Sequence, residues 1–163
     1  MDLELDYQIA LDGQGAAFPA KGLPSEQQLH DWVCTALEQA DYQQAAQLTI
    51  RVVGDKEMAQ LNHTYRHKDG ATNVLSFPFE APPEVPLPLL GDIVVCAPVV
   101  AQEAQQQHKT LMQHWAHMVV HGVLHLLGYD HITGAQAEQM ENLEIVILSR
   151  LGFANPYQIM EPT

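Results

Sequence analysis

Basic residues are scarce in this sequence. Its 163 residues include 7 lysines and arginines against 20 aspartates and glutamates, which gives a formal net charge of −13. So acidic a chain has no general attraction for nucleic acids or anionic membranes, because both carry negative charge. We therefore expect neither DNA nor a membrane among its partners. Any contact with phosphate groups has to depend on a few local cations.

Cysteines and long apolar runs are scarce as well. Cys34 and Cys96 are the only cysteines, and each lies in its own apolar stretch, so we expect two reduced core thiols and no disulfide. No apolar run approaches the roughly eighteen residues of a membrane helix. The N-terminal MDLELDYQIA also lacks the basic and apolar pattern of a signal peptide. These absences favour a cytoplasmic protein.

Segments with strand patterns and segments with helix patterns both occur along the chain, as in a fold that mixes the two. Strand patterns cover 3–11, 47–54, 72–79 and 89–97. Helical patterns begin at Ser25 and Asp55 and cover 98–127, with a break at 108–110, and 134–150. With 47% hydrophobic residues the chain is long enough to bury one core. We predict an α+β fold: a single domain, residues 1–163, with a mixed sheet of about four strands packed by about five helices.

Several local details accompany this prediction. Ser25 and Gln28 form a capping-box pattern, Asp55 is expected to cap the next helix, and Gly128 is expected to end the long one. Stretches 12–24 and 81–88, rich in glycine or proline, are expected to be loops. In the last helix, Met140, Leu143, Ile147 and Leu151 should face inward, and Glu138, Glu141 and Glu144 mostly outward.

The segment HGVLHLLGYDH, residues 121–131, carries the strongest chemical signal. His121 and His125 are four residues apart on a helix, so their rings share one face, and the turn after Gly128 can return His131 to them. Three neutral nitrogens leave the fourth position of a tetrahedral ion to water, as in catalytic zinc sites. We predict one Zn²⁺ at this site, although nickel, copper and iron also accept nitrogen ligands.

This spacing matches the metzincin protease motif HExxHxxGxxH at its histidines and glycine. The motif's glutamate base is replaced by Gly122, which cannot accept a proton, so peptide hydrolysis by that mechanism is disfavoured. Asp130 is a candidate for orienting a ligand imidazole or moving a proton, with a local turn cap as the alternative. For His114 and His117, a buried position on the helix is favoured over a contact with ligand or substrate, and neither is counted as a ligand.

A second feature is the stretch 65–68, where Arg66 and Lys68 stand beside His63 and His67 in a chain with little other positive charge. The planar guanidinium of Arg66 could clamp a phosphate or stabilise the negative charge that develops when phosphorus is attacked. A solvated polar loop is the alternative interpretation.

HGVLHLLGYDH together with YRHKDGATNVLSFPF, GDIVVC and HWAHMVVHG resembles the YbeY family, bacterial endoribonucleases of rRNA maturation, over about Leu48 to Tyr157. The resemblance implies a single-domain α+β fold, one bound zinc, and hydrolysis of phosphodiester bonds in single-stranded RNA. It also implies work on 16S rRNA ends and ribosome quality control, with rRNA and the small ribosomal subunit as partners. The positions that carry over are His121, His125 and His131 as zinc ligands and Arg66 as the catalytic or RNA-contacting arginine.

The favoured hypothesis is therefore a zinc-dependent endoribonuclease of 16S rRNA 3′-end maturation, in which metal-bound hydroxide attacks the phosphodiester and Arg66 stabilises the charge. With so few cations, we expect weak intrinsic affinity for RNA and targeting by a partner such as a basic ribosomal protein. Two alternatives remain open. One is a metallohydrolase of peptides or small molecules, and the other is a non-catalytic, zinc-stabilised ribosome-assembly factor.

Overall fold

The computed structural model describes residues 2–11, 22–80 and 87–157. In these residues four strands form one sheet of order β1-β2-β4-β3, in which β1, β2 and β4 run parallel and β3 runs antiparallel to β4. The strands are β1 (Leu3–Ala10), β2 (Ala46–Val53), β3 (Val74–Pro78) and β4 (Leu89–Cys96). The sheet is mixed, as predicted, and β3 forms one of its edges.

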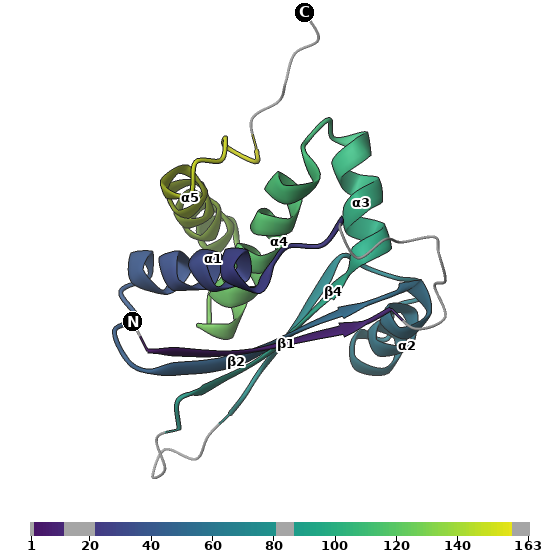
Figure 1. Ribbon diagram of the computed structural model, residues 1–163, viewed down its shortest axis with the longest axis horizontal. Helices are drawn as coiled ribbons and strands as arrows, with labels where there is room; N and C mark the ends of the chain where they lie inside the picture. The colour runs from purple at the N-terminus through teal and green to yellow at the C-terminus, as the bar shows by residue number, and fades with distance from the viewer. Residues whose placement is uncertain (1, 12–21, 81–86, 158–163) are drawn as a thin grey trace, which may run out of the picture.

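Five helices in the described residues complete the predicted α+β fold. They are α1 (Glu26–Gln39), α2 (Asp55–Arg66), α3 (Ala97–Gln106), α4 (Leu111–Leu126) and α5 (Gly134–Arg150). Helices α1, α4 and α5 lie on one side of the sheet and α2 lies on the other (Figure 1). None of the helices in the described part of the chain is both long and apolar enough to cross a membrane.

Helix α4 lies at the centre of the larger core. It contacts α1, α3, α5 and the sheet, and nearly every residue from His114 to Leu126 is buried. On the sheet side, Leu48, Ile50 and Val52 alternate inward from β2, as the two-residue period of a strand requires. A smaller cluster lies between α2 and the opposite face. Helix α4 is therefore held from several sides, which makes it a rigid base for the histidines at its C-terminal end.

Most of the predicted helix boundaries are confirmed. Ser25 and Gln28 form the capping box, and the predicted break at 108–110 is where Thr110 caps α4. The prediction for Asp55 is wrong, because Gly54 occupies the N-cap position and Asp55 is the first helical residue. Its negative charge still favours a helix N-terminus, where the backbone N–H groups point outward.

Gly128 ends α4 as predicted. Its φ of +99° lies in the left-handed region that glycine adopts without a steric penalty. The N–H of Gly128 donates to the carbonyl of His125 at 3.0 Å, and that of Tyr129 donates to the carbonyl of Leu124 at 3.0 Å. These bonds turn the chain back over the end of the helix and bring residue 131 toward it.

One prediction for α5 is wrong in a way that affects function. Met140 and Ile147 are buried as expected, and Glu138 and Glu141 are exposed, but Glu144 is 0% exposed. The inward stripe that joins Met140 to Ile147 passes through position 144, so helical periodicity places this residue against α4. Burial of the carboxylate is tolerated because α4 and the C-terminal segment supply hydrogen-bond donors to it.

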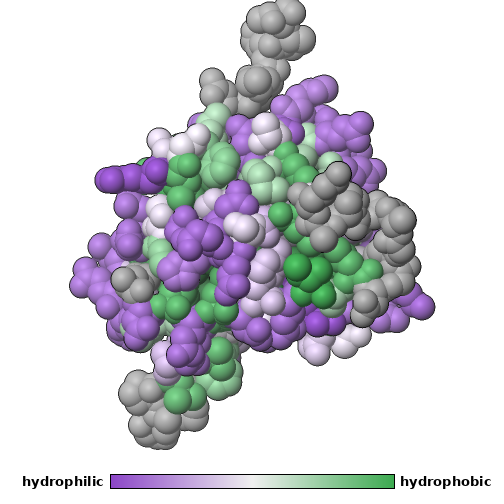
Figure 2. Space-filling view, viewed as in Figure 1, coloured by the Kyte–Doolittle hydropathy of each residue, from purple (hydrophilic) through white to green (hydrophobic). Residues whose placement is uncertain are grey.

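The remaining expectations concern loops, thiols and the surface. The predicted loops at 12–24 and 81–88 lie largely outside the described residues. Cys34 and Cys96 are free, and burial raises the pKa of the Cys96 thiol to about 12, so it is protonated and unreactive. Hydrophilic residues cover much of the face shown in Figure 2, with smaller hydrophobic areas between them.

Candidate metal centre and its cleft

The three predicted histidines come together. His121 and His125 extend from the last turns of α4, and His131 follows the turn at Gly128. One ring nitrogen from each lies within 4.8 Å of the others, and Nε2 of His121 is 3.0 Å from Nε2 of His125. A tetrahedral zinc ion with ligand nitrogens at about 2.0–2.1 Å separates them by about 3.3 Å. This cluster has the size and donor set to hold one metal ion.

The environment of His125 favours its neutral imidazole. Burial, followed by the neighbouring His121 and His131, lowers the pKa of His125 below its usual value. A neutral ring keeps a lone pair for a metal ion. His121 and His125 are half-buried and His131 is exposed, so the cluster opens toward solvent on the side of His131.

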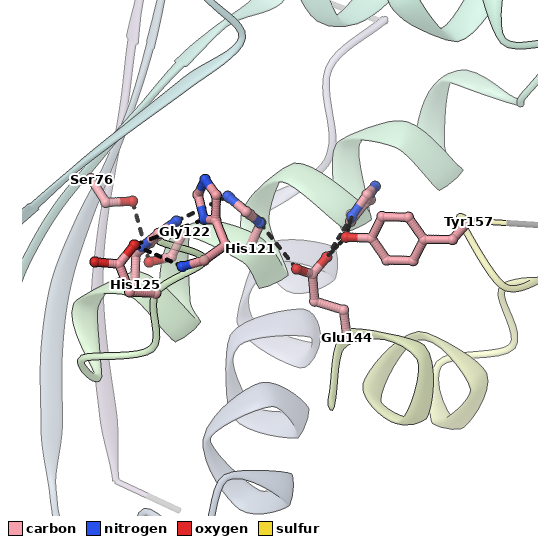
Figure 3. A network of polar contacts seen from close by, with 9 residues as sticks. Ser76, His121, Gly122, His125, Glu144 and Tyr157 are labelled. Atoms are coloured by element: carbon pink, nitrogen blue, oxygen red, sulfur yellow. Dashed lines mark hydrogen bonds and ion pairs between the residues drawn. The ribbon is translucent and has the colours of Figure 1, made fainter. Parts of the chain in front are cut away.

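A buried carboxylate supports the cluster from behind. His121 Nδ1–H donates to Glu144 Oε1 at 3.1 Å, which leaves its Nε2 lone pair directed at the other histidines. The second oxygen of Glu144 accepts from His117 Nε2 at 2.5 Å and from the hydroxyl of Tyr157 at 2.8 Å. Figure 3 shows Glu144 between His121 and Tyr157. A carboxylate in this position fixes the tautomer and the orientation of a ligand imidazole.

The Glu144 carboxylate is ionised at neutral pH. Burial alone would raise its pKa, but the hydrogen bonds from His117 and His121 outweigh burial and lower it to about 2. Burial and the adjacent Glu144 charge raise the pKa of Tyr157, which therefore remains a hydrogen-bond donor. A negative charge behind His121 strengthens the bond that its Nε2 can form with a metal ion.

Sequence reasoning missed Glu144 and Tyr157 as parts of this site. The signal for Glu144 was present, because its position continues the buried stripe of α5. Tyr157 comes from the segment after α5, and nothing in its local sequence indicates a partner on another helix. His117 is buried as predicted; its Nε2 contacts Glu144, and its ring lies edge-on to that of His121, with the centroids 6.4 Å apart.

Asp130 and His114 have other partners. Oδ1 of Asp130 accepts the backbone N–H of His131 at 2.8 Å and lies 3.9 Å from its Nδ1. This is the local turn cap that the sequence left as an alternative, and the orienting contact to a cluster imidazole comes from Glu144. His114 is buried against Glu103, with Nε2 2.8 Å from Oε1.

A cleft of about 660 Å³ joins the histidines to the predicted arginine. Its lining combines the three histidines, the turn 128–130, residues 73–76 and 78, and Arg66. Arg66 is the last residue of α2, and His67 follows it in the left-handed conformation that ends the helix. The buried side chain of Asn62 donates to the carbonyl of Gly70 at 2.9 Å, which ties down the loop after Arg66. Two motifs far apart in the sequence therefore line one cleft.

Gly122 has a packing explanation. A Cβ at this position would lie 2.9 Å from Cγ2 of Ile93 on β4, closer than carbon atoms normally approach. Its carbonyl accepts a hydrogen bond from the Ser76 hydroxyl at 3.3 Å, so α4 lies directly against the sheet here. Where the protease motif has its general base, this chain therefore has a glycine that allows α4 to pack closely against the sheet.

Comparison with known proteins agrees with these features. The family model described as endoribonuclease YbeY matches residues 20–152, and so begins earlier than the motif resemblance, which starts at about Leu48. The solution structure of TM1509 from Thermotoga maritima is similar, with a TM-score of 0.53 and 23% sequence identity, over 93% of this chain and 99% of that one. At this identity the structural likeness supports the fold alone.

Proposed function

Because the chain belongs to the YbeY endoribonuclease family, a family of nuclease hydrolases, we propose that it is a zinc-dependent enzyme that cleaves single-stranded RNA. Its substrate is rRNA, its step is 3′-end maturation of 16S rRNA, and its wider role is ribosome quality control in the cytoplasm. The observation that supports this proposal is the single cleft lined by Arg66 and by the cluster of His121, His125 and His131.

The three histidines are the proposed zinc ligands. Three neutral imidazoles around an open position are the donor set that zinc accepts in hydrolytic sites. Zinc held there would supply Lewis acidity and a nucleophile derived from water at neutral pH. Glu144 keeps His121 in the tautomer that presents Nε2 to the ion.

Arg66 is the proposed phosphate-binding residue. Its guanidinium carries donors in a planar fork that fits two oxygens of one phosphate, and it stays protonated at any physiological pH. Negative charge at the phosphate oxygens rises as the nucleophile attacks, and a fixed cation lowers the energy of that state more than that of the substrate. Its position at the end of α2 keeps the charge inside the cleft.

Charge also bears on targeting. Among the described residues that line the cleft, Arg66 is the only lysine or arginine, so binding displaces few counterions from RNA. Intrinsic affinity is therefore low, and a partner on the small ribosomal subunit brings the enzyme to its substrate. A basic ribosomal protein complements a chain with a net charge of −13.

The proposal is tested by comparing the wild type with His125→Ala, Arg66→Ala and the control Arg150→Ala, whose arginine is exposed on α5. Zinc content is measured by elemental analysis, and cleavage is assayed on a single-stranded rRNA fragment and on its duplex. The wild type and the control should bind one zinc ion and cleave only the single strand. His125→Ala should lose zinc and cleavage, and Arg66→Ala should lose cleavage alone.

Two results would overturn the proposal. Equal RNA cleavage by all four proteins would identify a contaminating nuclease as the source of activity. Normal 16S rRNA maturation in cells that carry only Arg66→Ala would favour the non-catalytic assembly factor. A peptidase of the metzincin type gains no support from the structure, because Gly122 packs on Ile93 where the catalytic glutamate would stand.

A further inference from the structure

In the described part of the chain β3 pairs only with β4, so its other edge is free, and residues of β3 form one wall of the cleft. Asn73 and Phe79, the residues on either side of β3, are hydrogen-bonded to β4. The N–H of Cys96 donates to the carbonyl of Asn73 and the N–H of Phe79 donates to the carbonyl of Leu90, both at 2.9 Å. In an antiparallel pair the residues bonded to the partner strand alternate with residues whose N–H and C=O point away from it. With Val74 opposite Val95 and no shift in register, the outward residues of β3 are Val74, Ser76 and Pro78.

These outward residues also line the cleft, together with the three histidines. Their carbonyl oxygens all point toward the free side of the sheet. Their donors are much fewer, because the Val74 N–H donates to Asn73 Oδ1 at 2.7 Å and Pro78 has no N–H. Among the described residues, only the Ser76 N–H remains available on this edge. The edge therefore offers three acceptors against one donor.

An edge with this composition is poorly suited to a polypeptide strand. Strand addition needs donors and acceptors in alternation along the edge, and a proline at an outward position is one way in which proteins prevent it. The complement of an acceptor-rich edge is a ligand that presents donors at regular intervals. Outward carbonyls recur every two residues, about 6.8 Å apart along a strand.

Single-stranded RNA is such a ligand. Each nucleotide carries a 2′-hydroxyl that donates a hydrogen bond, and this group distinguishes RNA from DNA. Contacts of this kind need no cation, which fits a cleft whose lining contains one arginine and no lysine among the described residues. Arg66 then binds the phosphate, and the main chain of β3 recognises the sugar.

We propose that the outward carbonyls of Val74, Ser76 and Pro78 accept hydrogen bonds from the ribose 2′-hydroxyls of the substrate, which lies extended along β3 beside the histidine cluster. This selects RNA over DNA. The inference rests on the proposed function, since it assumes that a nucleic-acid strand occupies the cleft.

The test uses the zinc-loaded wild-type protein and RNA oligonucleotides modified at one or two nucleotides beside the cleaved bond. The cleaved nucleotide keeps its own 2′-hydroxyl, so that the chemistry is unchanged. The modifications are 2′-deoxy, 2′-fluoro and 2′-O-methyl, none of which can donate a hydrogen bond. Each one should lower kcat/KM about fivefold per lost bond, and two adjacent ones should lower it about 25-fold.

A second measurement locates the contact. Hydrogen exchange of β3 amides is followed in the zinc-loaded wild-type protein with an RNA whose scissile linkage is a bridging methylenephosphonate, which is bound without being cleaved. RNA should slow exchange of the Ser76 amide and leave β1, the opposite edge of the sheet, unchanged.

Undiminished kcat/KM with all three modifications, or RNA binding without protection of β3, would overturn this inference and leave the nuclease activity standing. A failure of the unmodified RNA to be cleaved would instead overturn the proposed function, and this inference with it.

Discussion

His121 donates its Nδ1–H to the buried carboxylate of Glu144, 3.1 Å away. A residue of α5 thereby sets the tautomer of a residue of α4, and the same carboxylate is held in place by His117 and Tyr157. The candidate metal centre therefore includes residues outside the segment 121–131 from which it was predicted. Its behaviour should depend on residues that contact no metal ion.

The first prediction concerns the charge on Glu144. Replacement by glutamine keeps the size of the side chain but removes the negative charge and one acceptor oxygen. Zinc affinity, measured by competition with a chelator, should fall about 10- to 100-fold, as for other carboxylates that support a ligand histidine. Glu141→Gln, an exposed position on the same helix, is the matched control and should bind zinc like the wild type. Equal affinities for the two variants would contradict the positioning role.

The second prediction concerns Tyr157. Phenylalanine at this position removes only the hydroxyl that donates to Glu144 and keeps the edge-on ring contact with His117, whose centroid is 5.3 Å away. The free energy of unfolding should fall by about 1.5–3 kcal/mol, the range for a hydrogen bond to a charged group. Urea unfolding of the metal-free proteins measures the difference. An unchanged urea midpoint would contradict this prediction, because water would then replace the hydroxyl without any loss of stability.

The third prediction is a pH dependence of stability. The pKa of Glu144 is lowered from 4.5 to about 2 in the folded protein, so the ionised form stabilises the fold. This contribution is complete above about pH 4.5 and is lost as the pH falls toward 2, because the unfolded chain then takes up the proton first. Metal-free wild type should lose more stability than Glu144→Gln across this interval in urea titrations. Parallel curves for the two proteins would refute the assignment.

The fourth prediction concerns Gly122. In an open helix, alanine is more stable than glycine by about 1 kcal/mol. Here the added Cβ meets Cγ2 of Ile93 at 2.9 Å, so Gly122→Ala should destabilise the protein by about 1–3 kcal/mol through overpacking. Gly134→Ala, at the first residue of α5 with no atom within 4 Å of its Cβ, is the control and should be neutral or stabilising. Stabilisation by both substitutions would rule out the close contact.

Much of the site was predictable because its signals are local. The four-residue spacing of His121 and His125 places two rings on one helix face whatever surrounds the helix, and Gly128 ends that helix through its own backbone conformation. For Arg66 the pooled charge suggested a phosphate contact with a solvated polar loop as the alternative, and the cleft is what places this residue with the histidines.

By itself, then, the sequence determined the elements, the triad of histidines, the arginine and the family to which they point. Only the tertiary structure decided that Glu144 contacts His117 and His121, that a Cβ at position 122 would meet Ile93, and that residues of β3 line the cleft. The reason is physical. Periodicity and turn chemistry act within a few residues, whereas the burial of a charge or the exposure of a strand edge depends on which other element packs there.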